Sequence, residues 1–205
     1  MIIEMRSYQL KPGNVPEFEK RFGDKLPGRL KFSPLAALWH TEVGPLNTMI
    51  HVWPYASIEE RTRIRAEAVK AGAWPPDTHD LINEMQSEIY IPAPFSPALE
   101  PRSGFGIYEI RKYTYAPQTI PAVIEAWSKM IEARVKLSPL IGAWYSELGA
   151  LNRWCHIWAY KDANERAQVR AKAVAEGLWP PKSPPGALLK MENMLVVPAA
   201  CSPLK

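Results

Sequence analysis

Two histidines are the side chains of this sequence whose type and position best suit chemistry. His51 and His156 lie in strand-like segments, where an imidazole that faces an enclosed space could act as a general base or bind a metal or a haem iron. The alternative, which we favour, is a neutral histidine hydrogen-bonded to Glu4 or Glu109 or to a backbone carbonyl. No catalytic residue is therefore assigned from the sequence.

Arginine and glutamate alternate in two other strand-like segments. Glu4 and Arg6 lie two residues apart, as do Glu109 and Arg111, so the members of each pair share one face of a strand. A partly desolvated guanidinium binds a carboxylate in a two-pronged fork, so the arginines could hold an anionic ligand. They could equally balance the glutamates across the sheet, and both alternatives stay open.

Aromatic side chains accompany these polar ones and could wall an apolar pocket, although tryptophan at such positions is also common in a plain core. Met49 stands where the second half has the larger Trp154, so a single ligand pocket is expected beside Met49, His51 and Arg6. The complete set of candidate ligand-binding residues is Arg6, Tyr8, Trp39, Met49, His51, Trp53, Arg111, Tyr113, Trp144, His156 and Trp158.

Metal ligands do not occur at the spacings that metal sites use. There is no His-x-His, no His-x-x-x-His and no cysteine cluster, so we predict no metal and no cofactor, and haem is the least favoured ligand. Cys155 and Cys201 have no cysteine counterparts in the first half, which predicts two reduced thiols.

All of these residues belong to a sequence pattern that occurs twice along the chain. Glu4, Arg6 and Tyr8 return 105 places later as Glu109, Arg111 and Tyr113, and Trp74-Pro75-Pro76 returns as Trp179-Pro180-Pro181. One extra residue then enters the second copy, which shifts its last segment by 106 places. Two like units in one chain are expected to pack as a pseudo-two-fold pair.

Each half reads β-α-β-β-α-β. Alternating segments at 2–10 and 107–115 predict strands, and apolar residues spaced three and four apart from Val15 to Lys31 predict a helix. A hairpin, a second helix that opens on a capping box at Ser57 or Asp162, and a last strand follow. The fold class is α+β, with a first ferredoxin-like repeat at 1–97, a linker at 98–105 and a second repeat at 106–205.

A four-stranded sheet with both helices on one face leaves its other face bare. Two such sheets can cover each other face to face, and eight strands together enclose a barrel just wide enough for side chains or one small ligand. His51 and Trp53 share one face of their strand, whereas Ile50 and Val52 share the other. We expect the aliphatic face under the helices and the polar, aromatic face inside the barrel.

These motifs together resemble the NIPSNAP family. They are Glu4-x-Arg6-x-Tyr8 with Lys11-Pro12-Gly13, Thr41-Glu42-x-Gly44-Pro45-Leu46-Asn47, His51-x-Trp53-x-Tyr55 and Glu60-Arg61-x-x-x-Arg65, and most of them recur in the second half. The resemblance covers the whole chain and implies a dimeric α+β barrel, an architecture shared with haem-degrading and cofactor-free monooxygenases. It implies no reaction, because the family has no generally accepted catalytic residues.

Composition narrows the class of protein further. Hydrophobic residues make up 47% and charged residues 22% of the chain, as in an ordinary globular protein. The net charge of +4 is spread without a basic run, which argues against nucleic acid, and no apolar segment predicts a membrane span. The expected location is the cytoplasm.

We expect a protein that binds a small anionic or aromatic molecule in the barrel, with monooxygenase-like chemistry as one form of that function. The alternative is a structural or protein-interaction module whose barrel is filled. The sequence leaves open whether the whole chain also forms a homodimer.

Overall fold

The computed structural model describes residues 1–205 and shows eight antiparallel strands closed into one barrel, with the helices outside it. The first half contains β1 (Ile2–Leu10), α1 (Val15–Leu30), β2 (Ala37–Val43), β3 (Thr48–Tyr55), α2 (Ile58–Lys70), a 3-10 turn (His79–Leu81) and β4 (Ile82–Pro92). The second contains β5 (Ile107–Tyr115), α3 (Ile120–Ser128), α4 (Ile131–Val135), β6 (Leu140–Leu148), β7 (Arg153–Tyr160), α5 (Ala163–Ala175) and β8 (Leu188–Pro198). The predicted α+β class and the tandem repeat are confirmed.

Local sequence explains where these elements begin and turn. Ser57 caps α2 and accepts a hydrogen bond from the Glu60 amide, and Asp162 caps α5 through the amide of Glu165. Asn47 and Asn152 adopt φ 55° in the two hairpins, a left-handed conformation that asparagine tolerates better than most residues. None of the helices combines the length and the apolar character that crossing a bilayer requires.

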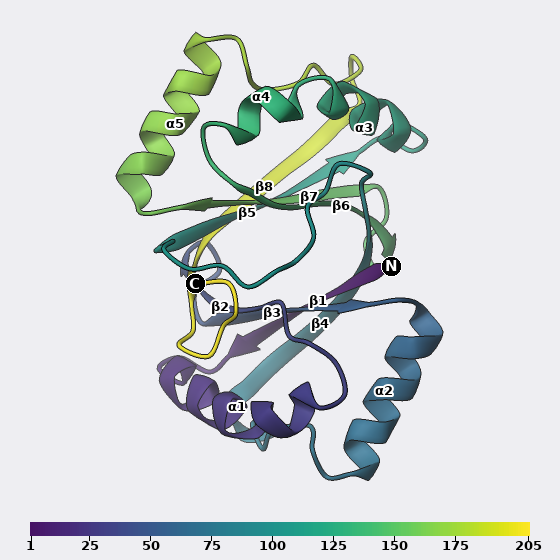
Figure 1. Cartoon of the computed structure of the whole chain (residues 1–205), viewed down its shortest axis with the longest axis vertical. Helices are drawn as coiled ribbons and strands as arrows, with labels where there is room; N and C mark the ends of the chain where they lie inside the picture. Colours follow the sequence, from purple (N-terminus) through teal and green to yellow (C-terminus); the bar gives the residue numbers. More distant parts are fainter.

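The two halves are joined edge to edge as well as face to face. Around the barrel the strands follow the order β1-β3-β2-β8-β5-β7-β6-β4, so the halves meet where β2 pairs with β8 and where β4 pairs with β6. Figure 1 shows the strands between two helical layers, with α1 and α2 on one side and α3, α4 and α5 on the other. Closure leaves neither sheet with a free edge.

Each repeat also sends its final segment onto the other repeat. The Ala93 amide donates to the Ala143 carbonyl at 2.9 Å, and Ser96 Oγ accepts from the Ala143 amide at 3.1 Å. In the second half, Ser202 Oγ accepts from the Leu38 amide at 3.0 Å. This exchange accounts for the repeated Ser-Pro pair that follows the last strand of each half.

The side chains inside the barrel are the reverse of those expected. Ile50, Val52, Cys155 and Ile157 belong to one buried cluster of 17 residues that mixes both halves and fills the barrel. Met49 and Trp53 instead pack beneath the helices of the first half, among residues such as Phe18 and Phe22. The prediction that the polar, aromatic face points into the barrel is therefore wrong. The alternation was correctly identified, but the two faces were exchanged.

Separating the halves should unfold or aggregate them. A chain cut at Gly104 would expose two barrel edges and the apolar interior of each sheet, and a soluble monomer does not tolerate a patch of that kind. We expect each half, expressed alone, to be insoluble or to self-associate in sedimentation experiments, and the two to form a 1:1 complex when co-expressed. Cooperatively folded monomeric halves would contradict this architecture.

Candidate functional site

On the outer face of the first sheet, Glu4 of β1 is surrounded by arginines. Its side chain is fully buried and accepts hydrogen bonds from Arg6 Nη1 at 2.8 Å and Arg61 Nη2 at 2.5 Å. Arg65, also on α2, lies 3.8 Å from the second carboxylate oxygen, and Ser87 Oγ of β4 donates at 2.9 Å. We call Glu4, Arg6, Arg61 and Arg65 the first arginine cluster.

The second half repeats this arrangement around Glu109. Arg111 and Arg166 each approach the carboxylate to 2.6 Å, and Arg170 lies at 3.6 Å; these four residues form the second arginine cluster. Burial alone would raise the pKa of Glu4, but the hydrogen bonds and charges of its arginines outweigh burial and lower that pKa to about 2. The pKa of Glu109 is lowered for the same reasons. The structure thus favours charge balance within the fold over a free anion site at Arg6 and Arg111.

The two histidines are neutral and fully enclosed. Trp53 Nε1 donates to His51 Nδ1 at 2.6 Å, and Trp158 Nε1 donates to His156 Nδ1 at 2.8 Å. An indole N–H can only donate, so each imidazole carries its proton on Nε2. Burial lowers the pKa of His51 to about 3 and that of His156 well below its usual range. The expected partners, glutamate or backbone, are replaced by an indole two residues along the same strand.

One buried arginine in each half packs on the tryptophan beside the histidine, and neither arginine was identified from the sequence. Arg29 lies over the Trp53 ring at 4.6 Å and donates to Tyr55 Oη at 2.9 Å and Ser33 Oγ at 2.7 Å. Arg134 stands equivalently over Trp158 at 4.1 Å. The available signal was an arginine followed four residues later by serine, which recurs at a shift of 105.

The remaining candidate residues are divided between two environments. Trp39 and Trp144 lie in the barrel interior, where Trp39 packs against Tyr108 with ring centroids 4.9 Å apart. Residues of the other face lie beneath the helices, and these are Met49, Trp53 and Trp158, with Tyr8 and Tyr113 partly buried at the edge. The eleven candidates therefore do not line one cavity, and none of Met49, His51 and Arg6 lines a principal cavity.

The barrel does have a cavity, but at one end and lined by different residues. Its volume is about 310 Å³, within the range of small-molecule sites. Both halves contribute to the lining, which is polar except for Pro45 and Met194: Ser7, Gln9, Pro45, Thr48, Glu84 and Gln86 come from the first, and Lys112, Arg153, Glu192 and Met194 from the second. We call this the barrel-mouth cavity.

A charged group lies at the inner end of this cavity. Along β4 the inward-facing residues are Glu84 and Gln86 at the lining, then Glu88, then the fully buried Tyr90. Glu88 forms ion pairs with Lys112 and, at 3.2 Å, with Arg153 Nη1. Burial would raise the pKa of Glu88, but the charges of Lys112 and Arg153 lower it. An ionised carboxylate and two cations thus separate the cavity from the apolar interior.

This charged group occurs once, because the repeats differ at all three positions. Lys112 corresponds to Ser7 and Arg153 to Thr48 at a shift of 105, while Glu88 corresponds to Met194 at a shift of 106. None of Glu88, Lys112 and Arg153 is among the candidate residues named from the sequence. They were missed because Ser7 and Lys112 lie on the strand face that the sequence analysis placed under the helices.

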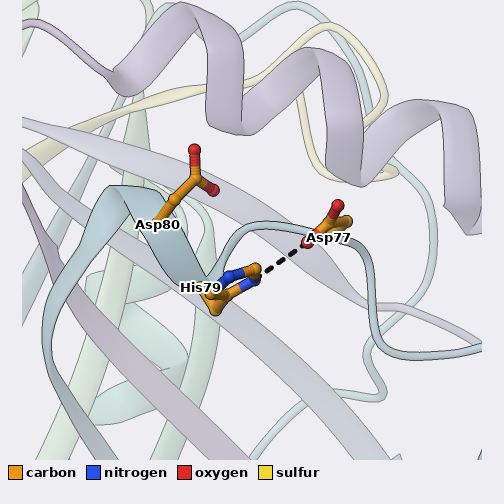
Figure 2. Close-up of side chains that lie close together, drawn as sticks. All are labelled: Asp77, His79 and Asp80. Atoms are coloured by element: carbon orange, nitrogen blue, oxygen red, sulfur yellow. Dashed lines mark hydrogen bonds and ion pairs between the residues drawn. The ribbon is translucent and has the colours of Figure 1, made fainter.

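One surface group has the composition of a metal site. Asp77, His79 and Asp80 present ligand atoms within 4.8 Å of one another, and all three are exposed (Figure 2). His79 Nδ1 lies 2.9 Å from an Asp77 oxygen, and Asp80 forms an ion pair with Arg21 at 2.8 Å. These contacts satisfy the group without a metal, and no buried ligand side chain is aimed at it, so it does not support a metal site.

The architecture and its repeated motifs agree with known proteins. The NIPSNAP family model matches residues 3–97 and again residues 108–203. The chain belongs to the NIPSNAP family. Human Protein NipSnap homolog 3A is 31% identical over 218 residues, which cover 98% of this chain and 85% of that protein. The Dictyostelium discoideum NipSnap homolog is 26% identical and covers 87% of this chain.

Solved structures are similar to the whole chain or to one half of it. A protein from Fusobacterium nucleatum described as a "Putative monooxygenase" covers 97% of this NIPSNAP chain at 10% identity with a TM-score of 0.66. A NIPSNAP family protein from Agrobacterium tumefaciens covers 47% of this chain and 96% of its own, at 29% identity and a TM-score of 0.45. The first is similar in fold alone.

Removing Glu4 should destabilise the protein more than removing one arginine. Glu4→Gln leaves Arg6, Arg61 and Arg65 without a counter-charge, and breaking a buried pair in this way costs about 3–5 kcal/mol. Arg6→Met should cost less, because the helix arginines still face Glu4. Chemical denaturation measures both, with Arg63→Met, which breaks an exposed pair with Glu67, as a control that should cost less than about 1 kcal/mol. Equal losses for Glu4→Gln and Arg63→Met would contradict the cluster's role.

The enclosed histidines should make stability fall in mild acid. A group whose folded pKa lies below its unfolded value contributes stability that is complete above the unfolded pKa, here about 6.5, and is lost as the pH falls toward the folded value of about 3 for His51. We expect a loss of about 1.4 kcal/mol per pH unit for His51 between pH 6 and pH 4.5.

The control is a His51→Gln variant, which keeps an acceptor for Trp53 but cannot titrate. His40, whose pKa is raised by the hydrogen bond from its ring to Glu19, contributes in the opposite direction in both proteins, so it cancels from the comparison. Urea unfolding at several pH values should give a shallower dependence for the variant. Parallel curves would show that His51 does not titrate on unfolding.

Proposed function

We propose that this NIPSNAP protein binds a small carboxylate-bearing molecule in the barrel-mouth cavity. The observation that carries the proposal is that Glu88, Lys112 and Arg153, a group of three charges that the other repeat lacks, lie at the inner end of a polar cavity of about 310 Å³. Side chains that only supported the fold would be needed in both repeats equally.

The donors and acceptors of the cavity define the ligand. Arg153 uses Nη1 for Glu88, and its guanidinium has further N–H groups that can hold a carboxylate in a planar fork. Glu84 adds negative charge at the outer end of the lining, and Glu192, opposite Lys112 in the strand register, adds a second acid that pairs with Lys190 at 2.8 Å. A ligand that carries an amine or hydroxyl group together with its carboxylate would complement both ends, whereas a purely anionic one would meet repulsion from these acids.

A second candidate function is cofactor-free monooxygenase activity on the molecule bound there. It is supported by the fold shared with the Fusobacterium nucleatum protein and by Glu88, an ionised carboxylate adjacent to the cavity that could accept a substrate proton. Haem binding has less support, because His51 and His156 are enclosed by aromatic rings and line none of the principal cavities. A purely structural role would fit the packed remainder of the barrel but gives no reason for the charged group.

The binding test replaces the asymmetric cations by their counterparts in the first repeat. Isothermal titration with a panel of amino acids and hydroxy acids should identify a ligand of the wild-type protein, and Arg153→Thr should weaken it by at least about tenfold, a loss of about 1.4 kcal/mol. Lys112→Ser should also weaken binding. Arg65→Thr, which removes an outer-face arginine, should bind as the wild type does. Equal effects of Arg153→Thr and Arg65→Thr, or no ligand in the panel, would contradict the proposal.

A further inference from the structure

A second cavity lies outside the barrel, on the helix-covered face of the first half. Its volume is about 210 Å³, and four aromatic rings and two aliphatic side chains form most of its wall: Tyr8, Phe18, Phe22, Trp74, Ile82 and Met85. An apolar cavity of roughly 150 Å³ is enough to bind benzene. The space is therefore large enough for one aromatic ring with a short substituent.

The rings around this cavity are preorganised in a geometry that suits a bound aromatic ring. Phe22 meets Trp74 edge to face, with centroids 5.0 Å apart at 87°, and Tyr8 meets Phe18 in the same way at 6.2 Å and 86°. Edge-to-face contacts of this kind are the geometry that a further aromatic ring also prefers. Because Phe22 and Phe18 are fully buried, two walls of the cavity are held by the core and do not need to form on binding.

The second half provides an internal comparison. At the position of Phe22 it carries Trp127, whose larger ring system lies 4.5 Å from Trp179 at 86°. Trp127 also packs against Phe95, with ring centroids 6.3 Å apart. The residue that corresponds to Phe95 after the last strand of the second repeat is Cys201, which packs on the helix-covered face of the first half. Larger aromatic side chains thus occupy this region in the second half, one of them from the exchanged segment of the first repeat, while the first half has space for a separate ring.

The rim of the cavity is acidic. His79 belongs to the lining, and Asp77 and Asp80 flank it with ligand atoms within 4.8 Å of one another (Figure 2). Arg21 pairs with Asp80 and Glu17, and the Lys11 ammonium donates to the Asp80 carbonyl, so these three acids and two bases leave a net charge of −1. A positively charged substituent on the ring is therefore favoured over a carboxylate.

We propose that this cavity is a binding site for a small aromatic amine, with one ring inserted between Phe22, Trp74 and Tyr8 and the ammonium group at the Asp77–Asp80 rim. The site is separate from the barrel-mouth cavity and does not depend on the function proposed for it. None of the principal cavities is its counterpart in the second half, so we expect one molecule to bind per chain.

The probe is phenethylamine, titrated by calorimetry and by following the indole N–H signal of Trp74 in nitrogen-labelled protein, assigned with a Trp74→Phe variant. We expect one site, a shift of the Trp74 signal, and tighter binding of phenethylamine than of phenylacetate. Absence of binding at millimolar concentration, or equal affinity for the two compounds, would overturn the proposal as stated.

Two variants of the first half test the location of the site, and one variant of the second half is the control. Phe22→Trp installs the residue that the second half tolerates, and Met85→Trp, at a half-exposed position, covers the opening with little risk to folding. Each should weaken phenethylamine at least about tenfold. Met191→Trp, the equivalent change in the second half, should leave affinity unchanged. If Met191→Trp weakened binding as much as Met85→Trp, or if neither first-half variant weakened it, the ligand would be elsewhere and the assignment would be wrong.

Discussion

The structure depends on the requirement that a four-stranded sheet bury both of its faces and both of its edges. The helices of each repeat cover only one face, so the other face and the edge strands β2 and β4 need the second repeat. Closing the two sheets into one barrel satisfies the backbone groups of every edge and removes the apolar inner face from water. The exchanged terminal segments, held through Ser96 and Ser202, make the two halves mutually dependent.

Each face of the sheets buries only those charged side chains for which it also provides partners of opposite charge. Glu4 and Glu109 lie on the outer face because the arginines of α2 and α5 reach them there, and a buried carboxylate without such partners would be strongly destabilising. The interior admits only one charged group, in which Glu88 is matched by Lys112 and Arg153. Charge balance on the outer face is thus repeated in both halves, whereas the interior group occurs once.

Duplication followed by divergence explains why both cavities are asymmetric. In a symmetric barrel every inward-facing side chain would appear twice, and a site shaped for one molecule could form only on the axis. Here the positions of Lys112 and Arg153 are occupied in the other copy by Ser7 and Thr48, and these smaller side chains leave polar space beside the charges. On the outer face, Phe22 leaves space beside Trp74, whereas in the other half the larger Trp127 packs against Trp179.

The sequence by itself determined the repeat, the order of the elements, the turns and the residues that share each strand face, because these follow from local periodicity and short-range hydrogen bonds. It also offered charge balance between arginines and glutamates as one of two alternatives, although it expected pairing across the sheet and Arg6 pairs with Glu4 of its own strand. Only the tertiary structure decided which face enters the barrel. The two-residue periodicity of a strand shows that His51 and Trp53 share one face and that Ile50 and Val52 share the other. It does not show which pair lies beneath the helices. That choice depends on partners distant in the chain, such as Arg61 for Glu4 and Phe22 for Trp53, and on the narrow interior of an eight-stranded barrel, which the aliphatic face fills.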